Sequence, residues 1–180
     1  MASPQTGIFV EASTQHHFLE YSVGPDDNKE ELRRSVAEAL FGARDGASGT
    51  RTNMVIAFGP ALWNLLSPGD APDGLRPFEP VRGAGGYGIP STQRDILIWV
   101  HGTKLDDNLD RALEVHRHLV SVARLELDER GFTYHDSRDL TGFIDGTANP
   151  KGEAARAAAL VPENEPGAGG AFVLSPKMGP

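Results

Sequence analysis

An unbroken apolar run near the middle of the chain constrains its fold more than any other feature. All five residues from Ile96 to Val100 are apolar, and they lie within a predicted strand over residues 95–101. A strand with one face in water alternates apolar and polar residues, whereas a continuous apolar run is typical of a strand covered on both faces. The sequence therefore predicts a central strand, with other elements lying on both of its sides.

Apolar spacing elsewhere predicts the elements that surround this strand. A first strand is expected over residues 7–12, and residues 18–23 either continue it or form a second short strand. A helix opens at residues 26–27, where Asp27 and Glu30 have the spacing of a capping box. Further predictions are a strand over 53–58, a short helix over 61–66, a long helix over 107–127 and a strand over 131–135.

The order strand, helix, strand, strand, helix, strand is the ferredoxin-like arrangement. This is an α+β fold, in which an antiparallel sheet carries two helices on one face. In the long helix, one stripe is expected to pack on the sheet: Leu109, Leu113, His116, Val120, Ala123 and Leu127. Residues 67–90 hold many glycines and prolines without a clear period, and a connection of that length is usually functional or mobile.

Composition excludes several classes of function. The chain has 180 residues, a formal net charge of −8 and no cysteine. An acidic chain does not favour nucleic acid or anionic membrane surfaces, and the lack of thiols excludes disulfides, thiolate metal sites and cysteine nucleophiles. No apolar run is long enough to span a bilayer and the first residues do not resemble a signal peptide, so we expect a cytoplasmic protein. We expect none of the six histidines to bind a metal.

One glycine-rich stretch, residues 139–150, is the candidate functional site. It places the carboxylate of Asp145 between Gly142 and Gly146 and ends at Pro150. Apolar neighbours, Phe143 among them, would keep the acid poorly hydrated, which shifts a pKa and suits a proton-transfer role. A purely structural interpretation stays open, because Asp-Gly is a common turn dipeptide and Asn-Pro often begins a helix.

The same stretch resembles the Gly-Phe-x-Asp-Gly-Thr-x-Asn-Pro signature of the Dyp-type (dye-decolorizing) haem peroxidases, especially the bacterial cytosolic ones. Four further segments resemble the same family: Ala57-Phe58-Gly59 with Trp63, Arg94 to Ile98, Arg138-Asp139-Leu140, and Gly169 to Leu174. The resemblance covers nearly the whole chain but only the N-terminal half of the family.

The resemblance implies a fold and a site. The family has a pair of ferredoxin-like domains, so residues 1–137 would form the first domain, and residues 138–180 would form the distal glycine loop and the start of the second, haem-binding domain. Asp145 would be the distal acid and base, with Gly146, Thr147 and Asn149 beside haem b. Thr147 and Asn149 could equally make hydrogen bonds that only stabilise the loop. The proximal histidine and the distal arginine of the family would come after Leu174, in a region that this sequence does not contain.

The resemblance also implies partners. Hydrogen peroxide would be reduced, and dyes or phenols would supply the electrons. Four aromatic residues could relay those electrons or simply pack in the protein: Trp63, Tyr87, Trp99 and Tyr134. For Trp99 core packing is the expected role, because it lies inside an apolar strand. We expect a homo-oligomer.

Two other functions remain open at this point. Because a strand begins at Ala171 and the chain ends soon after, the polypeptide is expected to be truncated. It could then be a catalytically inactive ferredoxin-like fragment that associates with another subunit. It could also handle haem by removing the iron, in the manner of a deferrochelatase.

Overall fold

The computed structural model describes residues 3–24, 28–44, 52–139, 141–144 and 146–175. Its centre is a four-stranded sheet in the order β2-β5-β1-β6, in which all neighbouring strands are antiparallel. The strands are β1 (Gln15–Ser22), β2 (Thr52–Phe58), β5 (Ile96–Gly102) and β6 (Arg124–Phe132). Ile98 of β5 lies opposite Leu19 on one side and Ile56 on the other, which confirms the predicted central strand.

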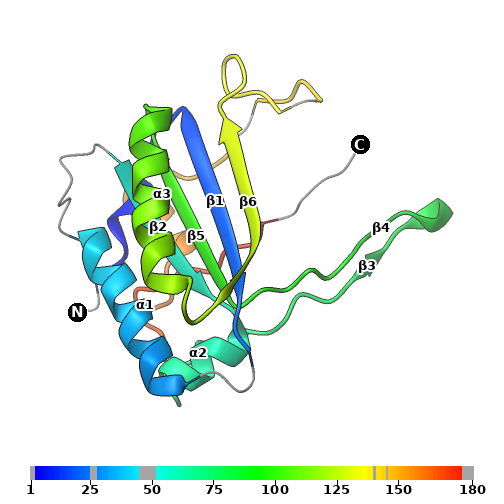
Figure 1. Cartoon of the computed structure of the whole chain (residues 1–180). Coiled ribbons are helices and arrows are strands. Elements are labelled where there is room, and N and C mark those ends of the chain that lie inside the picture. Colours follow the sequence, from blue (N-terminus) through cyan, green and yellow to red (C-terminus); the bar gives the residue numbers. More distant parts are fainter. Residues whose placement is uncertain (1–2, 25–27, 45–51, 140, 145, 176–180) are drawn as a thin grey trace.

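Two long helices cover one face of this sheet. They are α1 (Lys29–Arg44) and α3 (Leu105–Leu119), which lie side by side in front of the strands in Figure 1. The order β1, α1, β2, β5, α3, β6 and the strand order together give the expected ferredoxin-like fold. The remaining elements are η1 (Thr6–Phe9), α2 (Pro60–Leu66), β3 (Val81–Arg82), η2 (Ala84–Gly86), β4 (Gly88–Ile89) and α4 (Glu153–Ala159).

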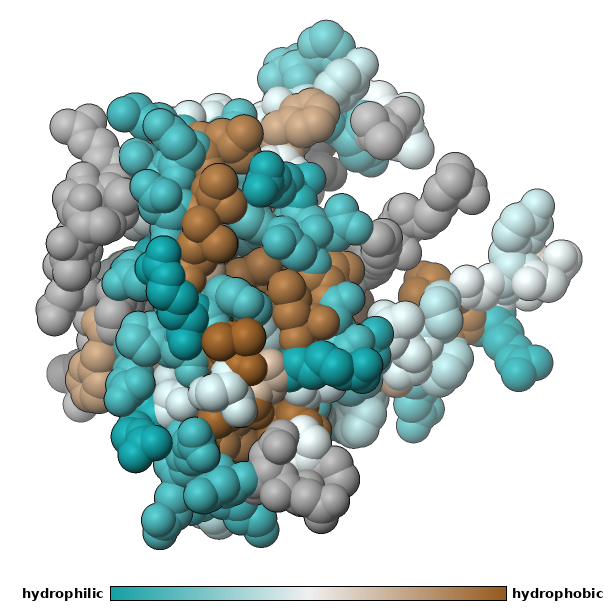
Figure 2. Space-filling model, viewed as in Figure 1, coloured by the Kyte–Doolittle hydropathy of each residue, from teal (hydrophilic) through white to brown (hydrophobic). Residues whose placement is uncertain are grey.

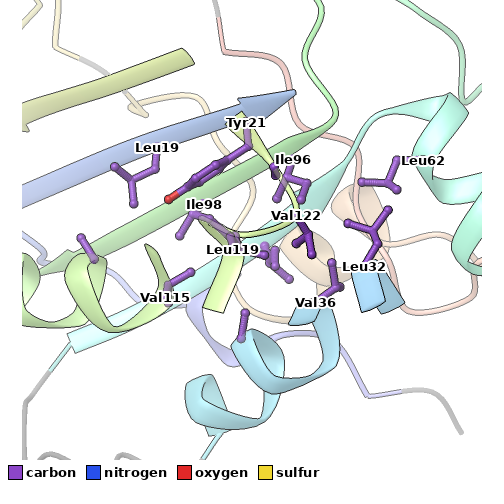
Figure 3. Packing of buried hydrophobic residues seen from close by; sticks show 14 of the residues in the cluster. Leu19, Tyr21, Leu32, Val36, Leu62, Ile96, Ile98, Val115, Leu119 and Val122 are labelled. Carbon is purple, nitrogen blue, oxygen red and sulfur yellow. The ribbon is translucent and has the colours of Figure 1, made fainter. Parts of the chain in front are cut away.

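The hydrophobic core lies between the sheet and the two helices (Figure 3). Successive side chains of a strand point to opposite faces, so every second residue of β5 enters this layer. Ile96, Ile98 and Val100 are at most 1% exposed, while Leu97 and Trp99 between them are half-buried on the other face. Leu32 and Val36 of α1 and Leu119 of α3 close the layer from the helical side.

The prediction of a first strand over residues 7–12 is wrong. Residues 6–9 form the short 3-10 helix η1, and the strand runs from Gln15 to Ser22. The strand includes His16 and His17, whose polarity argued against a buried element. His17 is nevertheless 1% exposed, because its Nε2 lies 2.6 Å from Oδ1 of Asp128 on the neighbouring strand β6. A partner 111 positions away compensates for the burial of the imidazole.

The long helix ends earlier than predicted. It stops at Leu119, and the strand that follows occupies Arg124–Phe132 rather than residues 131–135. The amide groups of Val122 and Ala123 both donate to the carbonyl of Leu119, which turns the chain back to the sheet. The face of α3 that packs on the sheet also differs from the predicted stripe, since Leu113 and Val120 are exposed and the buried residues are Asn108, Arg111, Ala112, Val115 and Leu119.

The start of α1 is capped by Asn28. Its Oδ1 accepts the amide N–H of Glu30 at 3.0 Å and of Glu31 at 3.3 Å, which satisfies two of the donors that a helix start leaves free. The predicted capping residue, Asp27, lies outside the described residues. The strand predicted over 53–58 and the helix predicted over 61–66 are confirmed, each extended by one residue at its start.

Strands β3 and β4 form a thin arm that projects away from the sheet at the right of Figure 1. We refer to residues 80–90 as the arm. Val81, Tyr87 and Ile89 on it are 52%, 82% and 46% exposed, and Figure 2 shows apolar residues among the white and teal residues there. Among the described helices, we find none with the length and apolar character needed to cross a lipid bilayer.

Candidate active site

Strand β6 leads into the glycine stretch, which begins as a tight turn over residues 138–144. Arg138 and Ile144 form an antiparallel bridge, and the amide of Asp139 donates to the carbonyl of Phe143 at 2.9 Å. Gly142 lies inside the turn with φ +97°, a backbone conformation that residues other than glycine rarely adopt. The backbone on the N-terminal side of Asp145 is therefore fixed by pairing within the turn.

The carboxylate of Asp139 organises this turn. Its Oδ1 accepts the Thr141 amide at 2.8 Å, the Thr141 hydroxyl at 2.6 Å and the Phe143 amide at 3.1 Å. Hydrogen bonds to a charged acceptor favour its ionised form. The Thr141 hydroxyl, helped by these backbone donors, holds the pKa of Asp139 below its ordinary value.

The guanidinium of Arg138 holds the same turn from the other side. Its Nε and Nη2 bind the two carboxylate oxygens of Asp136 at 2.7 and 3.0 Å, and its Nη1 donates to the carbonyl of Gly142 at 2.8 Å. This is the arginine nearest to Asp145 in sequence. Because its donors already bind these oxygens, we assign Arg138 the role of stabilising the turn, and not the role of binding peroxide.

A second turn follows Asp145. The amide of Asn149 donates to the carbonyl of Gly146 at 3.2 Å, and Gly146 has φ +74°. The structure thus brings three of the predicted site residues, Gly146, Thr147 and Asn149, into one exposed turn. Asp145 itself lies outside the described residues, between the two turns.

The apolar neighbours of Asp145 are open to solvent. Phe143 is 74% exposed and Ile144 is 39% exposed, so the part of the chain described here does not enclose the loop as the sequence led us to expect. A Cβ placed on Gly142 would meet no atom within 4 Å. An exposed surface of aromatic, aliphatic and glycine residues fits one face of a flat apolar macrocycle such as haem, and covering it would also lower the hydration of the loop.

Five of the six histidines make polar contacts within the protein. His16 accepts the Trp99 indole N–H at 3.2 Å, and His116 lies 3.1 Å from the Tyr21 hydroxyl. Burial lowers the pKa of both His16 and His101. The sixth, His135, packs against the Tyr134 ring, with ring centroids 4.0 Å apart. Within the described ranges, no group of three or more His, Cys, Asp or Glu residues has the geometry of a metal site.

Trp99 lies in a stack of rings on the sheet face opposite α1 and α3. Its ring centroid is 4.2 Å from that of His101, 5.9 Å from that of His16 and 6.0 Å from that of Phe18. Trp63 is anchored differently, since its indole N–H donates to the carbonyl of Asp70 at 2.9 Å.

A groove of about 560 Å³ lies away from the glycine stretch. Its lining includes the apolar side chains of Phe58, Trp63, Phe78, Val161 and Phe172. None of the described residues between 141 and 149 lines this groove. Its size alone therefore does not connect it with Asp145.

Sequence reasoning proposed the glycine stretch as the candidate site but missed the residues that shape its first turn. It noted Arg138 and Asp139 only as part of a resemblance, and it gave Thr141 no role. The spacing Asp-x-Thr was a usable signal, because an Asp side chain commonly accepts the amide two residues later and so forms a turn.

Comparison with known proteins identifies the family and agrees with the fold. A family model described as Dyp-type peroxidase, N-terminal, matches residues 5–133, and one described as Dyp-type peroxidase, C-terminal, matches residues 136–178. A dye-decolorizing peroxidase of Rhodococcus erythropolis is 34% identical over 147 residues, which are 81% of this chain and 41% of that protein. One of Mycobacterium tuberculosis is 30% identical over 122 residues, covering 67% of this chain and 36% of that protein.

Solved structures show the same relationship. A Dyp-type peroxidase protein of Shewanella oneidensis has a TM-score of 0.79 at 30% identity, covering 89% of this chain and 53% of that one. A variant of Rhodococcus jostii DypB in complex with heme has a TM-score of 0.78 at 28% identity, covering 91% of this chain and 54% of that one. The chain thus spans about half the length of these solved structures, and 41% and 36% of the two dye-decolorizing peroxidases named above. With a family model over residues 5–133, this chain belongs to the Dyp-type peroxidase family.

Proposed function

We propose that this chain supplies the N-terminal part of a haem-dependent peroxidase, with Asp145 as its distal acid and base. The observation that carries the proposal is the pair of turns on either side of Asp145, which fix the backbone around one acid in a chain of this family. A catalytic carboxylate needs a defined position more than it needs a particular fold. The two turns define the backbone of the residues before and after Asp145.

Haem b is the cofactor in this proposal. The Rhodococcus jostii DypB variants of similar fold are described in complex with heme. Here the exposed Phe143 and Ile144 side chains and the open backbone at Gly142 would lie against the ring, with Gly146, Thr147 and Asn149 lining the same side. The bound haem would supply the redox chemistry that reduces peroxide.

Asp145 would supply the proton transfer. Cleavage of the O–O bond requires a proton to leave one peroxide oxygen and arrive on the other, which departs as water. A carboxylate held beside both oxygens accepts the first proton as a base and returns it as an acid. The ring stacked over the loop would also exclude water from the carboxylate, which favours its protonated form during the transfer.

The division of the chain and its partners belong to the same proposal. We place the first domain at residues 1–137 and the loop with the start of the second domain at 138–180. Hydrogen peroxide is the proposed oxidant, and dyes or phenolic donors are the proposed reductants. Assembly into a homo-oligomer and a cytoplasmic location remain predictions.

The test is Asp145→Asn in the haem-loaded protein, with Asp110→Asn on the exposed side of α3 as the matched control. Loss of a general acid and base should slow the reaction with peroxide by about 100-fold or more, and the control should react like the parent protein. Equal rates for Asp145→Asn and the parent would refute the role of Asp145. A chain that takes up no haem, judged by the absence of a Soret band, would favour the inactive ferredoxin-like module instead.

A further inference from the structure

We infer that Asp139 and Arg138 are positioning residues, which set the backbone before Asp145 in the absence of any ligand. Neither side chain is assigned a contact with peroxide or cofactor. Both start the turn over residues 138–144 and bind its backbone, Asp139 by accepting amide N–H groups and Arg138 by donating to a carbonyl. The effect on catalysis rests on the proposed function, whereas the effect on the turn does not.

Asp139 gathers three donors on a single oxygen. The Thr141 amide, the Thr141 hydroxyl and the Phe143 amide all lie within 3.1 Å of Oδ1. The carbonyl of Asp139 accepts the Gly142 amide at 3.1 Å, and its own amide donates to Phe143. The residue therefore holds three successive donors of the turn, and the lowered pKa of its carboxyl agrees with a charged acceptor at the centre.

Arg138 fixes the part of the turn that Asp139 does not reach, the carbonyl of Gly142. At φ +97° this glycine has wide conformational freedom, so its carbonyl would otherwise sample many directions. The guanidinium is itself oriented by two bonds to the Asp136 carboxylate, and its planar fork presents Nη1 to the Gly142 oxygen at 2.8 Å. Arg138 therefore fixes the carbonyl of Gly142, and the carboxylate of Asp136 fixes the orientation of Arg138.

The consequence for Asp145 is geometric. A misplacement of about 1 Å in a reacting group can cost about 100-fold in rate, and side chains on loops are harder to place than those on strands. Ile144, which pairs with Arg138 in the bridge, directly precedes Asp145 in the sequence, so the turn fixes the backbone up to the residue before the acid.

Amide hydrogen exchange in the 180-residue chain tests the structural half of this inference without haem. Asp139→Ala should speed exchange of the Thr141 and Phe143 amides by about 10- to 100-fold, because bonds to a charged acceptor are lost. Asp139→Asn keeps an oxygen in the same place and should preserve most of the protection. The amides of β5 serve as the internal reference for global unfolding, and their exchange should not change.

A second variant guards against an Asp139→Ala chain that fails to fold. Thr141→Val deletes only the hydroxyl bond, while Thr141→Ser retains it, so the first should speed exchange of the Phe143 amide and the second should not. Unchanged exchange in both Asp139→Ala and Thr141→Val would overturn the inference.

In the haem-loaded protein, Asp139→Ala should lower kcat with little change in KM, and Asp139→Asn should restore most of it. Altered exchange and kcat in Asp139→Ala, together with a fully active Asp145→Asn, would support positioning by Asp139 but reject the proposed role of Asp145. Altered exchange without any change in kcat would reject the link between positioning and catalysis.

Discussion

Replacing Ile98 by Ala should test the arrangement of the core most directly. Ile98 lies in the central strand β5, is 0% exposed and faces the layer between the sheet and helices α1 and α3. The substitution removes about three buried carbon groups worth about 0.8 kcal/mol each, or about 2.4 kcal/mol, before any cavity term. A partly retained cavity raises the expected loss to about 3–4 kcal/mol.

The matched control is Leu97→Ala in the same strand. Leu97 is adjacent in sequence but half-buried on the opposite face of the sheet, so its loss should cost about 1 kcal/mol or less. Urea denaturation of the two variants and the parent, with the slope of the transition compared, measures both values. If Leu97→Ala costs as much as Ile98→Ala, the assignment of the buried face is wrong.

Two further predictions concern the first helix and the loop. Asn28→Ala should lower the free energy of unfolding by about 1 kcal/mol, because it removes the acceptor for two amides at the start of α1, whereas Asn28→Asp should be nearly neutral in urea denaturation. The order of the loop should also depend on pH. Because the pKa of Asp139 lies below its ordinary value of 3.8, ionisation stabilises the turn above that value, and the stabilisation is lost as the pH falls through the lowered pKa. The NMR signal of the Phe143 amide should report this loss at acidic pH in the parent chain. If the Phe143 amide signal of Asp139→Asn changed over the same acidic pH range as in the parent chain, ionisation of Asp139 would not be the cause.

Sequence-based prediction succeeded where the apolar pattern of a segment matches the burial of that segment in the folded chain. Strand β5 was predicted correctly because a continuous apolar run is typical of a central strand, and the boundary between β2 and α2 because Gly59-Pro60 ends a strand. Strand β1 was predicted in part: residues 18–23 were expected to be extended, and β1 covers most of them, but its start at Gln15 was missed because His16 and His17 look solvated. The buried His17 contacts Asp128 of β6, and a contact over 111 positions leaves no local pattern.

The C-terminal end of α3 was predicted wrongly for a different reason. Ala123 and Leu127 continue the predicted helical stripe, so the helix was extended through them. The alternation Leu-Glu-Leu-Asp over residues 125–128 was equally visible. Hydrogen bonding to β1 decided between the two, and that partner is known only in three dimensions. At the candidate site, residue types located the loop, whereas the roles of Arg138 and Thr141 depended on distances.

The arm has a consequence for how the molecule is cut by proteases. It is a two-stranded ribbon of two residues per strand, and an isolated ribbon of this kind is at best marginally stable. None of its residues belongs to the buried cluster between the sheet and the helices. Trypsin should therefore cleave first after Arg82, and the nicked chain should keep its sheet and melt almost like the intact one.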